Sequence, residues 1–336
     1  MKTKHVLVLG SGSVGKRHAR NLAELECEIS CFDPREDRRG ELASEVEIRK
    51  AYDDWHEALE DGAPDGVVVA SPTAYHAEQA KEAMRRGIPV LLEKPLAKTA
   101  VEAREMAAVH EATSTPLLLG YTWRWWPPLK KARDAITAGE LGTIRHVQFY
   151  MSAHLADWHP WEPYQEFFMS SASEGGGALL DESHWIDLMY WFFGKPEAVY
   201  AQVERISDLE IDSDDNVDIL VEYGSGLRAS VHLDLYGRPH EKSIRFVGSK
   251  GTLVWSAEPN ELRIGRGSGQ EWEYERFDYE RNEMFTQVAQ EFITVLDGHP
   301  PKGCTVSDGV AVMEFIESVR RSSVDGRKIT LEDHGV

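Results

Sequence analysis

Short apolar runs alternate with amphipathic stretches over the first third of the chain. The runs end abruptly at Gly, Ser, Asp or Glu and are typical of buried strands, whereas the stretches between them follow the 3.6-residue period of a helix. Strands are predicted at Val6–Leu9, Glu28–Phe32, Val67–Ala70, Val90–Leu92 and Leu117–Leu119, and helices up to Leu25, at His76–Arg86 and at Glu102–Glu111. Repeated units of this kind predict a parallel, doubly wound sheet with ligands beyond the carboxyl ends of its strands.

The pattern changes after Tyr121, where a segment rich in Trp and Pro interrupts the alternation. From Val199 to Ile264 the apolar positions recur every second residue between glycine-rich turns, which predicts an antiparallel sheet. Strands are predicted at Ile144–Ser152, Val217–Tyr223, Leu227–Leu235, Ser243–Val247 and Thr252–Trp255, and helices at Leu129–Ala138, Asp181–Phe193, Asn282–Leu296 and Val306–Ser322. The economical division is an α/β domain at residues 1–122 and an α+β domain at residues 123–336.

One turn near the start of the chain carries the first chemical signal. Gly10-Ser11-Gly12-Ser13-Val14-Gly15 follows the first strand and opens the first helix, a context that makes Gly-x-Gly-x-x-Gly a dinucleotide-binding fingerprint. Gly10 permits the tight turn, Gly12 lets the backbone approach a diphosphate, and Gly15 lets the helix pack on the strand. The N–H groups at the helix start would bind the anion. A glycine-rich turn without a ligand is the alternative.

Asp33 follows the second strand, eighteen residues after Gly15. An acidic residue there suits the 2′- and 3′-hydroxyls of an adenosine ribose, which favours NAD as the cofactor. Arg35, Arg38 and Arg39 follow closely and could instead hold the 2′-phosphate of NADP. Ser71 and Glu93 also lie at strand ends, so they are expected to converge with Gly10 in space.

The composition of the chain limits the classes of binding partner and the cellular location that we expect. The net charge of -20 comes from 37 Lys and Arg against 57 Asp and Glu, and it argues against nucleic acid or an anionic membrane. A high-salt habitat would also fit this charge. Three cysteines, Cys27, Cys31 and Cys304, form no C-x-x-C pair, so buried thiols are expected. The sequence shows no signal-peptide pattern and no apolar run of membrane-spanning length, which predicts a cytoplasmic protein.

Taken together, the motifs resemble the Gfo/Idh/MocA oxidoreductases. The residues that carry the resemblance are Gly10-x-Gly12-x-x-Gly15-x-x-His18, Ser71-Pro72-Thr73 with His76, Glu93-Lys94-Pro95, Trp123-Arg124-Trp125-Trp126-Pro127, and Gly175-Gly176-Gly177 with Asp181 and His184. The resemblance implies a Rossmann domain followed by an α+β domain with a large open, mostly antiparallel sheet. Two residues separate Asp181 from His184, rather than the three usual among inositol dehydrogenases, which weakens the assignment of Asp181 more than that of His184.

Lys94 matches the family's catalytic lysine. It follows a buried strand, and desolvation at such a place can bring a lysine into the range of acid–base chemistry. The resemblance implies that Lys94 moves the proton of the reacting hydroxyl, assisted by His184 and Asp181. A structural histidine on an apolar helix is the alternative for His184. Glu93 is expected to orient Lys94 or contact a ribose, Pro95 to fix the turn through a cis bond, and His18 to pack beneath the cofactor.

Two sets of binding residues follow from the motifs and the resemblance. The cofactor set is Gly10, Ser11, Gly12, Ser13, Val14, Gly15, Asp33, Arg35, Ser71, Pro72, Thr73, His76, Glu93, Lys94 and Arg124. The substrate set is Lys94, Arg124, Trp125, His159, Trp161, Tyr164, Asp181 and His184. Aromatic rings can stack on the C–H face of a sugar, and the long loop from Leu155 to Ser173 is suited to close over it, or else to plug the fold or build a subunit interface. No metal is expected, because the histidines match no zinc spacing.

The function predicted is that of an NAD(P)-dependent dehydrogenase or reductase acting on a CH–OH group of a sugar, inositol or nucleotide-sugar derivative. A lyase or glycosidase that uses bound NAD transiently is one alternative, and a non-catalytic, cofactor-binding regulator is another. The presence of both Lys94 and His184 disfavours the regulator. The resemblance also implies a homodimer or homotetramer formed through the exposed face of the second sheet.

Overall fold

A computed structural model describes residues 3–331 of the chain, except residues 159, 161 and 270. The chain forms two compact units. The first comprises Met1–Trp125 and Glu280–Met313, and the second Trp126–Tyr279 and Glu314–Val336. The return of residues 280–313 to the first unit has no signal in the sequence pattern. The division into domains at residue 122 takes no account of this return and stays a prediction.

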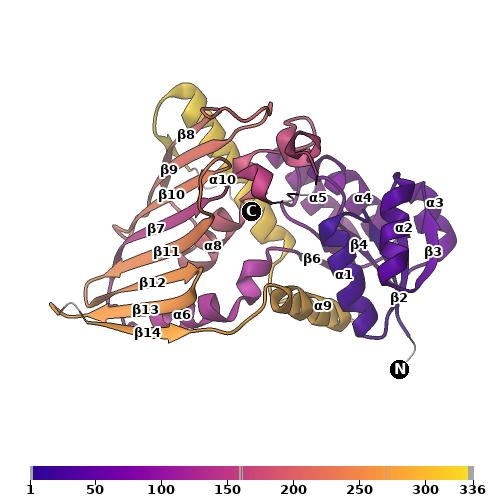
Figure 1. Ribbon diagram of the computed structural model, residues 1–336, viewed down its shortest axis with the longest axis horizontal. Coiled ribbons are helices and arrows are strands. Elements are labelled where there is room, and N and C mark those ends of the chain that lie inside the picture. The colour runs from indigo at the N-terminus through magenta and orange to yellow at the C-terminus, as the bar shows by residue number, and fades with distance from the viewer. Residues whose placement is uncertain (1–2, 159, 161, 270, 332–336) are drawn as a thin grey trace. The chain divides into compact units, whose positions relative to one another are not determined.

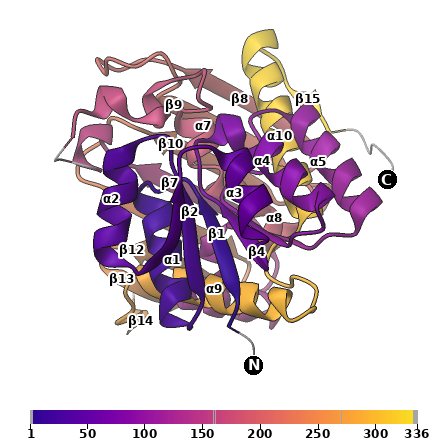
Figure 2. The ribbon, with the colours of Figure 1, turned by 90° about the vertical axis from the view of Figure 1, so that its right-hand side faces the viewer.

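The first unit is built on a parallel six-stranded sheet with helices on both faces (Figures 1 and 2). Its strands in spatial order are β3 (Ile48–Tyr52), β2 (Glu28–Phe32), β1 (His5–Leu9), β4 (Gly66–Val69), β5 (Val90–Leu92) and β6 (Leu117–Leu119). Its helices are α1 (Ser13–Glu24), α2 (Glu36–Glu45), α3 (Trp55–Gly62), α4 (Thr73–Arg85), α5 (Ala100–Thr113), η1 (Thr122–Trp125) and α9 (Asn282–Leu296). Helix α1 packs on α9, and α4 packs on α5. The central strands are wholly buried, as a sheet covered on both faces requires, and the predicted Rossmann fold is confirmed.

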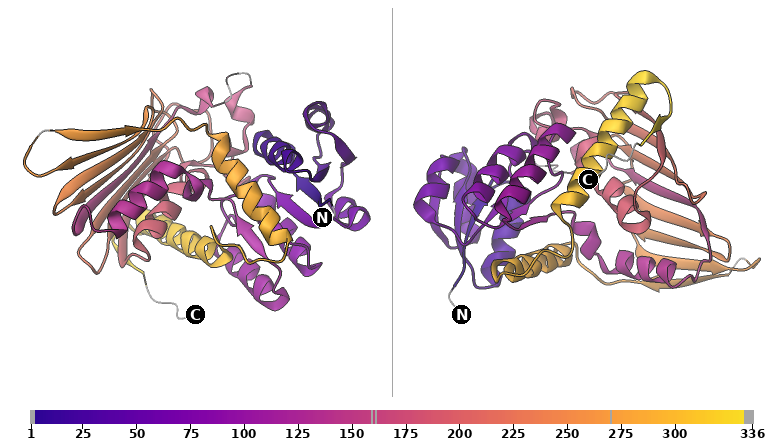
Figure 3. Two further views of the ribbon diagram at one scale, coloured as in Figure 1. Left: turned by 90° about the horizontal axis from the view of Figure 1, so that it is seen from below. Right: turned by 180° about the vertical axis from the view of Figure 1, so that it is seen from behind.

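The second unit contains a nine-stranded sheet with helices on one face (Figures 1 and 3). Its strands in spatial order are β14 (Trp272–Arg276), β13 (Asn260–Arg266), β12 (Gly251–Ala257), β11 (Glu241–Gly248), β7 (Ile144–Ser152), β10 (Arg228–Asp234), β9 (Asn216–Glu222), β8 (Ala198–Glu204) and β15 (Ile329–Thr330). The described pairs are antiparallel apart from β7 with β10. The helices are α6 (Pro127–Thr137), α7 (Ala178–Asp181), α8 (His184–Phe193) and the second half of α10 (Val306–Asp325). The predicted open, mostly antiparallel sheet is confirmed.

One predicted helix is wrong in its extent. The periodicity predicted a continuous helix over Asp181–Phe193, but the structure has two helices, of which the first ends at Asp181 and the second begins at His184. Trp185 donates its indole N–H to the carboxylate of Glu182 at 2.9 Å, a local bond that holds the bend between them. Among the helices of the described residues, none is both long and apolar enough to span a membrane.

Candidate functional site

The glycine turn between β1 and α1 has no room for a side chain at two of its glycines. Gly10 has a φ of +94°, and a Cβ there would lie 2.7 Å from the backbone nitrogen of Ser71. A Cβ on Gly15 would lie 1.8 Å from the carbonyl oxygen of Gly10. Within 4 Å, a Cβ on Gly12 would meet, among the described residues, only the guanidinium of Arg38, at 3.9 Å. The turn therefore presents open backbone at Gly12, which fits the approach of a diphosphate.

Asp33 lies at the carboxyl end of β2 and is buried. One carboxylate oxygen accepts a hydrogen bond from the backbone N–H of Ser11 at 2.8 Å, and the other accepts one from the backbone N–H of Arg35 at 3.0 Å. Each carboxylate oxygen retains a further lone pair, so the side chain can still accept hydrogen bonds from hydroxyl groups. This arrangement fits an adenosine ribose bound beside the glycine turn.

The three arginines after Asp33 have different surroundings. The guanidinium of Arg35 forms two hydrogen bonds with Asp37, at 3.1 and 2.5 Å. Arg39 donates to the main-chain carbonyl of Asp33 at 2.6 Å. The guanidinium of Arg38 lies beside Gly12 and is partly exposed. Of the three, Arg38 therefore has the position best suited to an anionic group on a ligand at the turn.

The end of β4 lies against the same turn. Ser71 is buried, and its hydroxyl has no hydrogen-bond partner among the described residues, which suits it to bind an added ligand. Pro72 and Thr73 open α4. His76 is buried, with Nδ1 2.8 Å from the Pro95 carbonyl and Nε2 2.9 Å from the Ser71 carbonyl. Burial lowers the pKa of His76, and its ring links β4 to the turn after β5, so its contact with a cofactor stays a prediction.

Glu93 and Lys94 follow β5. The Glu93 side chain is buried, with Oε1 2.7 Å from Nε2 of His18 and Oε2 3.3 Å from the backbone nitrogen of Lys94. Burial raises the pKa of Glu93, but the hydrogen bond with His18 and the charge of Lys94 outweigh it and hold the pKa below its usual range. An ionised carboxylate therefore lies next to Lys94. The Lys94–Pro95 peptide bond is cis, as predicted.

The strand ends converge as expected. Gly10 lies too close to the backbone of Ser71 to admit a Cβ, and His18, in the helix that follows the glycine turn, is hydrogen-bonded to Glu93. The backbone N–H of Glu93 in turn donates to the Val69 carbonyl at the end of β4, at 2.9 Å. One edge of the sheet in the first unit thus carries the glycine fingerprint, Asp33 and the turn with Lys94.

Arg124 and Trp125 lie in η1 and are buried. Arg124 donates to the Gly303 carbonyl at 3.0 Å and pairs with Asp308 at 3.2 Å. The indole N–H of Trp125 donates to Glu291 at 3.0 Å. These contacts give both side chains a packing role against the returning segment. The predicted contacts with cofactor and sugar gain no support from this packing and stay predictions.

In the second unit, Asp181 and His184 lie on either side of the bend between α7 and α8. Asp181 is buried, and His184 is partly buried. Asp214, which no sequence motif singles out, accepts a hydrogen bond at the start of α7 from the N–H of Leu179 at 2.8 Å. A Cβ on Gly177 would lie 2.5 Å from the Asp214 carboxylate, so the last residue of the triple glycine makes room for this contact.

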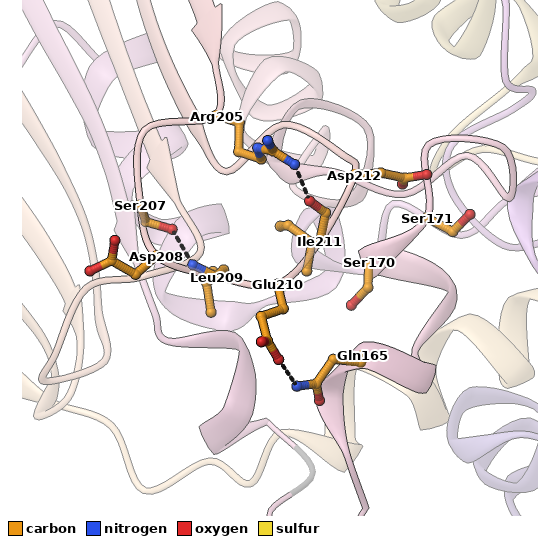
Figure 4. A pocket seen from close by; sticks show the side chains of 10 residues that line it. All are labelled: Gln165, Ser170, Ser171, Arg205, Ser207, Asp208, Leu209, Glu210, Ile211 and Asp212. Atoms are coloured by element: carbon orange, nitrogen blue, oxygen red, sulfur yellow. Dashed lines mark hydrogen bonds between the residues drawn. The ribbon is translucent and has the colours of Figure 1, made fainter.

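The loop predicted to close over the substrate forms a polar hollow with Arg205 and residues 207–212 (Figure 4). The cavity has a volume of 570 Å³. Gln165 donates to Glu210 at 2.8 Å, and Arg205 donates to the Ile211 carbonyl at 2.6 Å. The Tyr164 hydroxyl accepts the N–H of Glu210 at 3.2 Å, and its predicted contact with substrate stays a prediction. His159 and Trp161 lie outside the described residues.

Comparisons with known proteins agree with this architecture. Residues 4–121 match the profile of the Gfo/Idh/MocA oxidoreductase family, described as an NAD-binding Rossmann fold. Residues 129–254 match the profile of the Gfo/Idh/MocA C-terminal domain. The two profiles meet at the segment where the sequence pattern changes.

Individual relatives align over most of their length. The rhizopine catabolism protein MocA of Rhizobium meliloti is 30% identical, over 93% of this chain and 92% of that protein. The myo-inositol 2-dehydrogenase of Thermotoga maritima is 26% identical, over 97% of this chain and 98% of that enzyme. The solved structure of levoglucosan dehydrogenase in complex with NADH and levoglucosan shares the fold, with a TM-score of 0.88 at 20% identity and coverage of 99% of this chain and 100% of that one.

Proposed function

The chain belongs to the Gfo/Idh/MocA family of NAD-binding oxidoreductases, and from that premise we propose that it moves a hydride between nicotinamide and a carbinol carbon of a sugar or inositol derivative. Relatives named as dehydrogenases of myo-inositol and levoglucosan support a polyhydroxylated substrate. The observation that carries the proposal is the position of Lys94. It follows β5, next to an ionised and buried carboxylate, at the sheet edge that also holds the glycine turn.

The residues proposed to bind the cofactor lie at the glycine turn and at the end of β2. The open backbone at Gly12 and the N–H groups at the start of α1 would hold the diphosphate, and the Asp33 carboxylate would accept the ribose hydroxyls. The hydroxyl of Ser71, which has no hydrogen-bond partner in the described part of the chain, would be an additional donor beside the turn. When bound, nicotinamide supplies the acceptor or donor of the hydride, and the remaining work for the protein is to orient the substrate and move a proton.

Lys94 is proposed to move that proton. In alcohol oxidation its neutral amine accepts the proton of the reacting hydroxyl, and in ketone reduction its ammonium returns it. His184, at the first residue of α8, is proposed to bond the reacting oxygen or relay the proton to solvent, with Asp181 assisting. Both residues flank the bend between α7 and α8, where the indole N–H of Trp185 donates to Glu182.

The proposal is tested by incubating the protein with NAD or NADP and a panel of sugars, inositols and nucleotide sugars while the absorbance of reduced nicotinamide is followed. At least one polyol is expected to give net reduction, to be lost in Lys94→Ala, and to persist in Lys81→Ala, whose lysine pairs with Glu105 on the surface of α4 and α5. Formation of a product without net reduction of the cofactor would show that the protein is a lyase or glycosidase that oxidises its substrate transiently. Binding of the cofactor without turnover of any substrate would show that the protein is a non-catalytic regulator.

A further inference from the structure

His18 and Glu93 form a buried pair that joins two motifs of the first unit. His18 follows the glycine fingerprint in α1 and is fully buried, and Glu93 precedes Lys94. Nε2 of His18 lies 2.7 Å from Oε1 of Glu93. Because an ionised carboxylate only accepts hydrogen bonds, the imidazole is the donor. The other ring nitrogen, Nδ1, is buried without a hydrogen-bond partner among the described residues.

The surroundings of the pair leave room for the carboxylate. A Cβ on Gly120 would lie 3.1 Å from Oε1 of Glu93, so the glycine after β6 provides space for the Glu93 side chain. The ring of Phe285, from α9, meets the His18 ring edge-on at 5.5 Å and closes the other side. Taking an acid and an imidazole out of water is unfavourable, and an apolar pair of the same volume would pack at lower cost. Packing alone therefore does not explain why this site is polar.

We propose that His18 is a positioning residue that acts on Lys94 through Glu93. The hydrogen bond from His18 fixes one oxygen of the carboxylate, and the other oxygen faces the backbone of Lys94. The negative charge of Glu93 thereby stays beside Lys94 and favours its ammonium form. This inference rests on the proposed function, because it assigns the reaction's proton transfer to Lys94.

Other charged and titratable groups also face Glu93. Arg17, in the turn of α1 next to His18, interacts electrostatically with Glu93, and so does His76 of α4. Arg17 places its guanidinium over the ring of Phe285 in α9, at 4.7 Å, and Arg281, which precedes α9, interacts electrostatically with Arg17. His18 differs from Arg17 and His76 because its side chain is hydrogen-bonded to the Glu93 carboxylate.

The test compares pH profiles of kcat/KM for alcohol oxidation in His18→Leu, His18→Gln, Glu93→Gln and the His18→Leu/Glu93→Gln double variant. Without a charged carboxylate beside it, the Lys94 ammonium is less favoured, so the limb that rises with pH should move to lower pH. Glu93→Gln and His18→Leu are both expected to move this limb by roughly one pH unit. His18→Gln, whose amide N–H can reach the carboxylate, should restore the wild-type profile. In the double variant, His18→Leu should add nothing to Glu93→Gln.

A His18→Leu profile that keeps the wild-type limb at a lower overall rate, or a shift that adds to that of Glu93→Gln, would overturn the proposal and leave His18 a packing role. If His18→Leu fails to fold, His18→Asn takes its place, because its amide is too short to reach Glu93. Lys94→Ala is included in the same panel. If this variant keeps its kcat, the proton-transfer role of Lys94 fails first, and the His18 profiles then count against the inference as well.

Discussion

The carboxylate of Asp33 accepts a hydrogen bond from the backbone N–H of Ser11 at 2.8 Å. This bond ties the end of β2 to the glycine turn, so the proposed ribose-binding residue also braces the diphosphate site. The carboxylate is buried and its second oxygen is held by the N–H of Arg35. We therefore expect cofactor choice to depend on the same side chain that holds the glycine turn.

Replacing Asp33 should change cofactor preference. Asp33→Asn keeps an amide oxygen that can accept the Ser11 N–H but removes the charge, so it should weaken NAD binding by about tenfold and ease the repulsion of a 2′-phosphate. Asp33→Ala also removes the brace, so it should weaken both cofactors further. Fluorescence titration of NADH and NADPH against the three proteins measures these effects.

A wild-type protein that binds NADPH more tightly than NADH would contradict this view. The guanidinium of Arg38 would then be expected to bind the 2′-phosphate, because it lies beside Gly12, whereas Arg35 is hydrogen-bonded to Asp37. Arg38→Ala with Arg35→Ala as its control would show whether that one cation reverses the preference.

Removing the amine of Lys94 should abolish most of the turnover. Lys94→Ala is expected to lower kcat by about 10²–10⁴, the range of general acid–base catalysis. Lys94→Arg should fail nearly as badly, because guanidinium does not give up its proton near neutral pH. His184→Ala should cost less if water can replace the relay. Binding of reduced cofactor, followed by fluorescence, should persist in all three, and a Lys94→Ala enzyme with near-normal kcat would shift the role to His184.

The parts of the site that the sequence predicted are local in the chain. The glycine turn, its strand and its helix lie within twenty residues, so the spacing alone specifies their geometry. The convergence of Gly10, Ser71 and Glu93 was predictable because a doubly wound sheet places the carboxyl ends of its strands at one edge. The buried strands β1 and β4 could be predicted from the sequence because both consist mostly of apolar residues.

Long-range pairs and edge strands were missed for physical reasons. His18 and Glu93 lie 75 residues apart, and no periodicity encodes a hydrogen bond between them. β3 is an edge strand with mostly exposed residues, so it lacks an apolar run. Asp214 caps α7 from 35 residues away, and α9 returns to the first unit after β14 of the second sheet. Such contacts are selected by the assembled fold rather than by local pattern.

The glycine turn also predicts a difference in stability. A Cβ on Gly15 would lie 1.8 Å from the carbonyl oxygen of Gly10, so Gly15→Ala must displace backbone and should cost about 1–3 kcal/mol or more. Gly40 lies within α2, and a Cβ there would meet nothing within 4 Å among the described residues. Gly40→Ala should stabilise the protein by about 0.5–1 kcal/mol. Denaturant unfolding of both variants measures the contrast, and equal stabilities would contradict the tight packing of the turn.

A histidine on the second sheet should make stability depend on pH. Hydrogen bonding to Asp234 raises the pKa of His232 against the effect of burial, and Asp218 raises it further. Burial raises the pKa of Asp234, but the hydrogen bond with His232 helps to bring it below its usual value. The His232 contribution is therefore complete below the unfolded pKa of about 6.5 and is lost as pH rises through the folded value. The Asp234 contribution is lost as pH falls through its own lowered value.

His232→Gln should accordingly destabilise the protein more at mildly acidic pH than at alkaline pH, by up to about 1 kcal/mol for a partly exposed pair. Urea unfolding of wild type and variant at both pH values gives the comparison. His146→Gln, on the neighbouring strand β7, is the matched control. If the free energies of unfolding of wild type and His232→Gln differ by the same amount at both pH values, the ion pair does not contribute to the pH dependence of stability.

The exposed face of the second sheet is the surface on which we expect copies of the chain to associate. On β9 the side chains of Ile219 and Val221 are buried, whereas Leu220 between them is 60% exposed and lies in register with the exposed Tyr200 of β8. Apolar side chains that adjoin on the exposed face of a sheet favour burial against another surface.

A dimer or tetramer is therefore expected in solution, and Leu220→Lys should weaken it by placing like charges across a symmetric contact. Val324→Lys is the matched control, because Val324 is also apolar and 86% exposed but lies on α10 rather than on the sheet. Light scattering coupled to size exclusion, across micromolar concentrations, gives the mass of all three proteins. A shift toward the monomer in Leu220→Lys alone would assign the interface to this face. A monomeric wild-type protein would contradict the prediction. If Val324→Lys shifts the mass toward the monomer as much as Leu220→Lys does, the subunit interface does not lie specifically on this face of the sheet.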